Sequence, residues 1–369
     1  MMVATKSIKF LVVFVLALVT FPTFAQDDAK DDNLVNTPEE INAYIAHHLK
    51  DAHDFHLFTN NATGVHYGFS LPVIVWTSNG LKTFMSSEFK HNDEGEVVVN
   101  KDGTQLVKYH TKIYELEPGA TALELNEAQK PANAKRVLDL SITKSVLGML
   151  LAGLIMLLAF GGLARQYKKG NTIPKGFSRA LEPLVIYVRD EIAIPNIGEK
   201  KYRKFMGFLL TVFFFIWILN ILGLTPLGFN VTGQIAVTTC LAFFTMLVYM
   251  FSGTKDFWAH TLWMPGVPYL IRPLLAIIEL AGFLLIKPFS LLIRLFANIT
   301  AGHFIFMSLM ALMVSMKAAF GPVASTGLSL VLSLFIAMIE LLVAFLQAYI
   351  FTMLSSLFIG MSVADHDDH

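Results

Sequence analysis

The chain has little cysteine and few charged residues, and neither sign of charge is in excess. A single cysteine, Cys240, stands among 369 residues, which excludes an intrachain disulfide and a cysteine-based metal site. Lys and Arg number 28, as do Asp and Glu, so the net charge indicates no nucleic-acid partner. Charged residues make up 15% of the chain, whereas soluble globular proteins carry about 25%. With 54% hydrophobic residues, the composition instead predicts a polytopic membrane protein.

The motifs of intramembrane enzymes and the repeats of transporters are also lacking. We find no paired serine and histidine, no aspartate pair and no H-E-x-x-H, so we expect no catalytic residue, cofactor or metal. A secondary ion-coupled transporter would often contain inverted repeats, and this sequence shows no internal repeat. Such a transporter remains the alternative function.

The first 25 residues have the pattern of a secretory signal. Lys6 and Lys9 precede the apolar run "FLVVFVLALVTF", and "TFA" before Gln26 resembles a cleavage site. The alternative is an uncleaved first membrane helix. We therefore expect a signal peptide at 1–25, a periplasmic module at 26–134 and a membrane domain at 135–369.

The outer segment predicts a small α+β module. In "NTPEEINAYIAHHLKDAHDFHLF", Thr37 is a plausible N-cap and Pro38 fits the first helical position, which predicts one short helix. The following β-branched and aromatic runs, separated by Asn-Gly and Asp-Gly, are typical of hairpins.

A cluster of histidines and aspartates in this segment could bind a metal. Because His-rich exposed helices are common, we expect a solvated surface instead. The cluster comprises His47, His48, Asp51, His53, Asp54 and His56.

Five apolar stretches follow, at about 140–164, 205–224, 231–252, 267–316 and 325–361. The loop after the first stretch holds ten Lys and Arg, so the positive-inside rule places this loop in the cytoplasm. With a translocated N-terminus and five crossings, the C-terminus is also cytoplasmic. Within that loop, "FSRALEPLVIYVRDEI" predicts a surface helix along the membrane. The protein is thus expected in a bacterial inner membrane.

The last two stretches exceed the roughly 20 residues needed to cross a bilayer. They either tilt steeply or bend and fold back, and Pro268, Pro273 and Pro288 could break the fourth. The expected fold is an all-α polytopic membrane protein with about five membrane helices, the last two long and steeply tilted, a cytoplasmic surface helix and the α+β N-terminal module.

Ionisable side chains at membrane depth are concentrated in these two stretches. They are Glu279, Lys287, Arg294 and His303 in the fourth and Glu340 in the fifth, where Gln347 adds an amide. An arginine at the centre of a membrane helix costs about 3 kcal/mol on insertion scales and about 10 or more in simulations. Such residues generally face a cavity, an ion route or one another.

Helical geometry divides these residues into faces. At about 100° per residue, Lys287, Ser290, Arg294 and Asn298 share one face, while His303 lies about 180° from Arg294. Glu340 and Gln347, seven residues apart, share a face of the last helix. A buried ion pair of Arg294 with Glu340 or Glu279 is the purely structural alternative, but it leaves His303 and Gln347 without a role.

The stretch "KPFSLLIRLFANITAGH", followed by "IELLVAFLQAYIFTMLSSLFIG", resembles subunit a of the F-type ATP synthase. The preceding "WILNILGLTPLGFNVTGQIAVT" resembles the same family, and the resemblance covers about 138–361. It implies a non-catalytic, ion-translocating stator subunit whose partners are a ring of c subunits, b subunits, the rest of the ATP synthase, the lipid bilayer and protons. It says nothing of the outer module, and it leaves open whether H⁺ or Na⁺ is carried.

By this resemblance, Arg294 meets the ion-carrying carboxylate of each c subunit and separates two half-channels. Asn298 supports Arg294, and Gln347 lies close by on the neighbouring helix. His303 and Glu340 stand in the reverse order of many bacterial relatives, as in mitochondrial ones, and are expected to conduct protons from the outer side. Glu279 is a further expected ion-pathway residue, and Lys287 and Ser290 are expected to support the face toward the c-ring.

Overall fold

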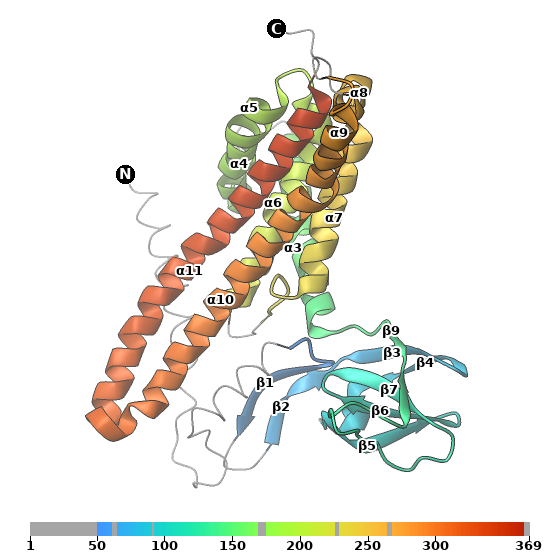
Figure 1. Cartoon of the computed structure of the whole chain (residues 1–369). Coiled ribbons are helices and arrows are strands. Elements are labelled where there is room, and N and C mark those ends of the chain that lie inside the picture. Colours follow the sequence, from blue (N-terminus) through green and yellow to red (C-terminus); the bar gives the residue numbers. More distant parts are fainter. Residues whose placement is uncertain are drawn as a thin grey trace. The chain divides into compact units, whose positions relative to one another are not determined.

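The structure is a computed structural model that describes residues 50–60, 65–90, 92–168, 175–225, 229–263 and 268–364. The chain divides into two compact units (Figure 1). The first comprises the described residues up to Met149 together with Thr225–Asn230, and the second comprises the remainder. The predicted signal peptide at 1–25 lies outside the described residues.

The first unit is built from antiparallel strands. β1 pairs with β2, β3 lies between β4 and β9, and the third sheet has the order β5-β6-β7-β8. A short 3-10 helix, η2 (Ser86–Phe89), follows β4. The strands are β1 (Asp54–Asn60), β2 (Val65–Ser70), β3 (Pro72–Thr77), β4 (Gly80–Met85), β5 (Glu94–Lys101), β6 (Thr104–Tyr109), β7 (Lys112–Leu116), β8 (Ala134–Arg136) and β9 (Leu138–Asp139).

The hairpin prediction is confirmed where the turns contain Asp-Gly and Asn-Gly. Lys101 faces Thr104 across the turn between β5 and β6, and the two residues within it, Asp102 and Gly103, have φ of 48° and 81°. Two successive positive φ angles match the twist of the flanking strands, which is why Asp-Gly is favoured there.

The helix prediction for the outer segment is wrong at its end, because residues from Asp54 onward form β1. The solvated-surface prediction is also wrong for His53 and Asp54. His53 is 2% exposed, and its Nε2 lies 2.7 Å from Oδ2 of Asp139. Asp54 accepts a hydrogen bond from Lys108 Nζ at 3.1 Å and another from Ser86. Partners distant in sequence allow these polar groups to be buried.

Within the residues that the structure describes, five helices are long and apolar enough to span a bilayer, which confirms the five predicted membrane crossings. They are α3 (Lys144–Lys168), α6 (Tyr202–Leu224), α7 (Ile235–Ser252), the continuous run of α9 (Arg272–Ala281), η4 (Gly282–Ile286) and α10 (Lys287–Ser315), and α11 (Lys317–Val363). A short helix, α8 (Lys255–Leu262), follows α7, and the side chain of Thr254 caps it by accepting from the Phe257 amide.

Pro273 and Pro288 do not break the fourth stretch, and Pro268 lies before its helix begins at Arg272. Pro273 lies in the first turn of α9, where its missing N–H is tolerated. Pro288 follows the π-helical turn η4, and the wider turn accommodates a ring that would clash in a regular helix. The buried Tyr249 hydroxyl on α7 donates to the carbonyl of Phe283 within η4 at 2.6 Å, which satisfies a backbone group that lipid could not.

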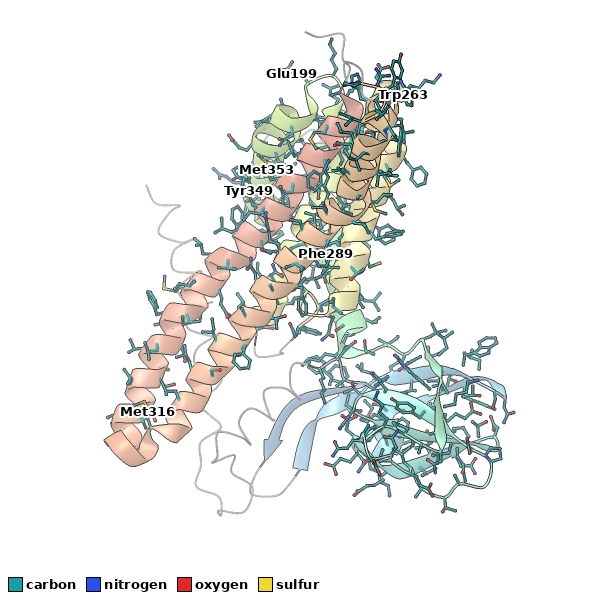
Figure 2. The ribbon with its side chains drawn as sticks, in the orientation of Figure 1. Glu199, Trp263, Phe289, Met316, Tyr349 and Met353 are labelled. Carbon is teal, nitrogen blue, oxygen red and sulfur yellow. The ribbon has the colours of Figure 1, made fainter. Side chains whose placement is uncertain are left out.

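Helices α10 and α11 form a long antiparallel pair that runs obliquely to α7 (Figure 1). Met316 lies at the turn between them (Figure 2), and Gly321 takes non-helical angles just after it. The spanning part of α11 has 41 residues. At 1.5 Å per residue it extends about 60 Å, twice the hydrocarbon thickness, which fits the predicted steep tilt.

The predicted surface helix forms as α4 (Phe177–Tyr187), continued by η3 (Val188–Ala193) and α5 (Ile194–Ile197). Its apolar face is buried against α11, whose Ser356 hydroxyl donates to the Ile192 carbonyl at 2.9 Å. Tyr349 and Met353 lie on the side of α11 that faces these helices (Figure 2). The Asn196 carbonyl rests directly against Gly360, so a side chain at position 360 would push the two elements apart.

Candidate functional site

Arg294 projects from a face of α10 that the rest of the described chain leaves uncovered. Exposed residues recur along this face at helical spacing, whereas Leu291 and Leu295 on the other side are buried in the helix bundle. Within the residues that the structure describes, Arg294 forms no ion pair. The structural alternative of an ion pair with Glu340 or Glu279 is therefore not formed.

One turn after Arg294, an amide pair connects α10 to α11. Asn298 Nδ2 donates to Gln347 Oε1 at 2.7 Å. Gln347 is 1% exposed, and its Nε2 has no hydrogen-bond partner among the described residues. Asn298 is itself exposed, on the same face of α10 as Arg294. The amide pair therefore extends from the buried interface between α10 and α11 to this exposed face.

Glu340 lies two turns before Gln347 on α11 and packs against Gly302 of α10. A Cβ placed on Gly302 would come within 2.8 Å of Glu340 Oε1, so a larger residue at position 302 would require the carboxylate to move. Glu340 Oε1 is buried without a hydrogen-bond partner in the described part of the chain. A buried acceptor in this position is costly unless water, a proton or another group reaches it.

A cavity of about 20 Å³ lies beside this carboxylate. Its walls are Asn220, Leu224, Asn298, Ile299, Gly302, Glu340, Val343 and Ala344. The volume and the three polar side chains are sufficient for one water molecule. A water there could join Glu340 to the amide of Asn298.

Asn220 and Thr232 are polar members of this region that the sequence analysis did not single out. Asn220 is 3% exposed; its Oδ1 accepts from the Thr232 hydroxyl at 2.9 Å, and its Nδ2 donates to the Ala344 carbonyl at 3.4 Å. The signal that could have found Asn220 is the one that marks Arg294, a polar side chain within an apolar run at membrane depth.

The remaining predicted site residues are placed differently. Ser290 and Glu279 are exposed. The Lys287 ammonium lies 3.2 Å from the ring centre of Phe283 and 5.3 Å from that of Phe358, so it contacts an aromatic cluster shared with α11. His303 belongs to α10, but its side chain lies outside the described part of the structure.

The arrangement places a permanent cation on an open face of α10, with polar side chains close to it. Arginine stays charged at any accessible pH, so Arg294 cannot itself release a proton. Close to that cation, Glu340 and Asn298 line the same cavity, and Asn298 is hydrogen-bonded to Gln347.

In the outer module, the alternative that the histidines and aspartates bind a metal receives no support from the residues that the structure describes. No group of three or more His, Cys, Asp or Glu side chains there could hold a metal ion. His53 instead pairs with Asp139. His47 and His48 lie outside the described residues.

Comparison with known proteins identifies the two parts of the chain separately. The family model described as "ATP synthase A chain" matches residues 146–360, and one described as "Domain of unknown function (DUF8433)" matches residues 44–140. The described strands of the outer module fall within the second range.

Several relatives named "ATP synthase subunit a" are similar over the membrane part. The protein of Chloroherpeton thalassium is 46% identical over 239 residues, which cover 63% of this chain and 69% of the relative. That of Chlorobium phaeobacteroides strain BS1 is 45% identical over 238 residues, or 63% and 68%. That of Myxococcus xanthus is 40% identical over 265 residues, or 69% and 85%. Because the family model matches more than half of its length, and its described part contains five helices able to span a membrane, this chain belongs to the subunit a family of the F-type ATP synthase.

Proposed function

We propose that this chain translocates protons or Na⁺ through two half-channels to and from a carboxylate on a ring of c subunits, and so couples ion flow to rotation and ATP synthesis. Nucleotide chemistry belongs to other subunits of the complex, and this chain acts as a non-catalytic stator. Family membership favours this function over a secondary ion-coupled transporter.

The observation that carries the proposal is the open position of Arg294. A guanidinium at membrane depth is costly unless an anion or water solvates it. The described chain offers Arg294 no carboxylate, although Glu279 and Glu340 lie on the same two long helical runs. A carboxylate supplied by another subunit at the exposed face would meet this need.

Such a partner explains why a fixed cation is useful. A protonated c-ring carboxyl is neutral and can pass through lipid, and it releases its proton on reaching Arg294 because a nearby positive charge favours the ionised form. Since arginine itself holds its proton, it also blocks direct passage between the two half-channels. Asn298, held by Gln347, would position the turn that carries Arg294.

The outer half-channel would reach this point through Glu340 and His303. Glu340 lies beside a polar cavity that can hold a water molecule, and water bridges can relay protons between such groups. Glu279 and Lys287 are proposed to lie along the ion route and the c-ring face, with Ser290 exposed on that face.

The proposed setting is a bacterial inner membrane, with residues 26–134 periplasmic after removal of 1–25 and the C-terminus cytoplasmic. The basic loop between α3 and α6 supports this orientation. Partners are the c-ring, b subunits and the rest of the ATP synthase.

The test is ATP-driven proton pumping in inverted vesicles that carry the intact complex. Arg294→Ala should abolish pumping, and Arg294→Lys should lose most of it because lysine lacks the planar, non-titrating group. Passive proton conductance of the Arg294→Ala complex should rise, since the barrier between the half-channels is gone.

The matched control is Arg203→Ala, which removes another exposed arginine near the start of α6. It should pump normally at the same level of c-ring co-purification. Near-normal pumping by Arg294→Ala, at matched assembly, would contradict the proposed function.

A further inference from the structure

The sheet β4-β3-β9 in the outer module has one face that is almost wholly apolar and exposed. Cross-strand partners place these side chains beside one another: Trp76 is opposite Leu81 on one side and Leu138 on the other, and Pro72 is opposite Met85. Trp76 is 57% exposed, at the centre of the patch. The large members of this face, here called the Trp76 face, are Trp76, Leu81, Met85, Leu138 and Leu140.

The fold of the module does not need this face to be apolar. Successive side chains of a strand point to opposite faces, and the inward set, Val73, Val75 and Phe84, already fills the core. Thr83 stands between Leu81 and Met85 on the outward side, and Lys82 points inward, where it pairs with Asp102. A contiguous apolar face of this kind marks an interaction surface.

The edge strand of this face leads directly to helix α3. Leu140 donates its amide to the Ile74 carbonyl at 2.8 Å, and Ile142 donates to the Pro72 carbonyl at 3.1 Å, so the edge strand continues along β3. Leu138, Leu140 and Ile142 alternate with Asp139 and Ser141, which point to the buried side. Helix α3 begins only two residues later, at Lys144.

The first turn of α3 is fixed to the same module. Lys144 donates its amide to the Ala52 carbonyl at 3.0 Å, and the Ser145 amide bonds to Asp51 Oδ1 at 2.9 Å. Lys144 stands four positions after Leu140, and a chain segment of this length spans at most about 14 Å at full extension. The Trp76 face is therefore confined to the immediate neighbourhood of the point where a membrane-spanning helix starts.

We propose that the Trp76 face rests in the headgroup region of the bilayer leaflet that α3 enters. Tryptophan is enriched at this depth because its ring is apolar while its N–H can stay hydrated. Further along the chain, α3 also carries exposed apolar side chains, including Leu150 and Leu154. The occupant is thus lipid, and the face anchors the module at the membrane surface beside its own transmembrane helix.

The test uses nitroxide labels on the intact complex reconstituted in liposomes. Cys240→Ser removes the only native cysteine, and single cysteines then replace Thr83 and Leu138 on the Trp76 face. Controls carry the label at Glu127 and Lys130, which are exposed away from this sheet. At 83 and 138, collisions with oxygen should exceed those with a water-soluble nickel chelate severalfold, and at the controls the order should reverse.

Two outcomes would overturn the proposal. Free access of the nickel chelate at both 83 and 138 would place the face in water. Protection from both reagents would show that a protein subunit covers it.

A second variant tests the anchor itself. Trp76→Gln should raise the access of the nickel chelate at position 83 severalfold, while amide protection of Leu106 and Val107 in the module core stays unchanged. Leu125→Gln, which alters an exposed leucine outside the sheet, should leave position 83 unaffected. Unchanged access after Trp76→Gln would contradict the anchoring role.

Discussion

Asn298 of α10 and Gln347 of α11 are joined by a 2.7 Å hydrogen bond one turn away from Arg294. Gln347 is buried and Arg294 is exposed, so the bond fixes the rotation of α10 at the position where the arginine emerges. The exposed face that carries Arg294 is thus connected, through Asn298, to the buried amide of Gln347.

Gln347→Leu should reduce ATP-driven proton pumping severalfold in complexes that still assemble. The substitution removes the acceptor of Asn298, and a net loss of about 1 kcal/mol is typical for one such hydrogen bond. Comparison with Asn298→Leu and the double variant forms a cycle, and the two single effects should be strongly non-additive. Additive losses would mean that the two amides act independently.

Gly302→Ala should slow proton flux because the new Cβ would come within 2.8 Å of Glu340 Oε1 and displace the carboxylate. Gly327→Ala on α11 is the matched control, since nothing lies within 4 Å of its added Cβ. Flux is measured in vesicles at equal c-ring content. Equal flux in the two variants would show that the position of Glu340 beside Gly302 has no role in transport.

His303 and Glu340 should behave as a coupled pair in proton flux. His303→Ala and Glu340→Ala are expected to be strongly non-additive, and the exchange His303→Glu with Glu340→His should recover part of the flux. The physical reason is that two ionisable groups at membrane depth stabilise each other and can share a proton. Strict additivity, with an exchange no better than the single variants, would leave the two residues unconnected.

Acid should destabilise the outer module through Asp139. Burial alone would raise the pKa of this carboxyl, but the hydrogen bond and charge of His53, together with hydrogen bonds from Ser141, hold it below its usual value of 3.8. Because the folded pKa is the lower one, the stabilisation is present above pH 3.8 and is lost as the pH falls through the folded pKa.

Hydrogen exchange of the Leu140 and Ile142 amides, corrected for intrinsic rates, measures this effect in the full chain. Asp139→Asn should be less protected near neutral pH and should lack this acid-induced loss. An unchanged loss in Asp139→Asn would assign the acid sensitivity to other groups.

The orientation predicts opposite labelling of two exposed glutamates. In a Cys240→Ser background, Glu127→Cys in the module should react with an impermeant maleimide in cells whose outer membrane alone is permeabilised. Glu199→Cys, in the connection between α5 and α6, should react only after the inner membrane is broken. The reverse pattern would invert the proposed topology.

The sequence alone predicted the membrane architecture and singled out Arg294 as a candidate site residue. An apolar run long enough to cross a bilayer must form a helix there, since lipid offers no partner for backbone groups, so five runs predict five spans. The Asp-Gly turn was also predictable, because two consecutive positive φ angles at Asp102 and Gly103 are a local requirement. Helical spacing correctly placed Asn298 near Arg294 on α10.

Only the tertiary structure decided which residues on different elements meet. The register of α10 against α11 brings Asn298 to Gln347 and Glu340 to Gly302. The spacing of residues within one helix cannot predict how that helix is aligned with another. Likewise, His53 and Asp139 are 86 residues apart in the sequence. The sequence predicted an exposed histidine, whereas in the folded module His53 is buried and paired with this distant carboxylate. Burial of a polar side chain depends on such distant partners, because its desolvation must be offset by a hydrogen bond that only the folded chain supplies.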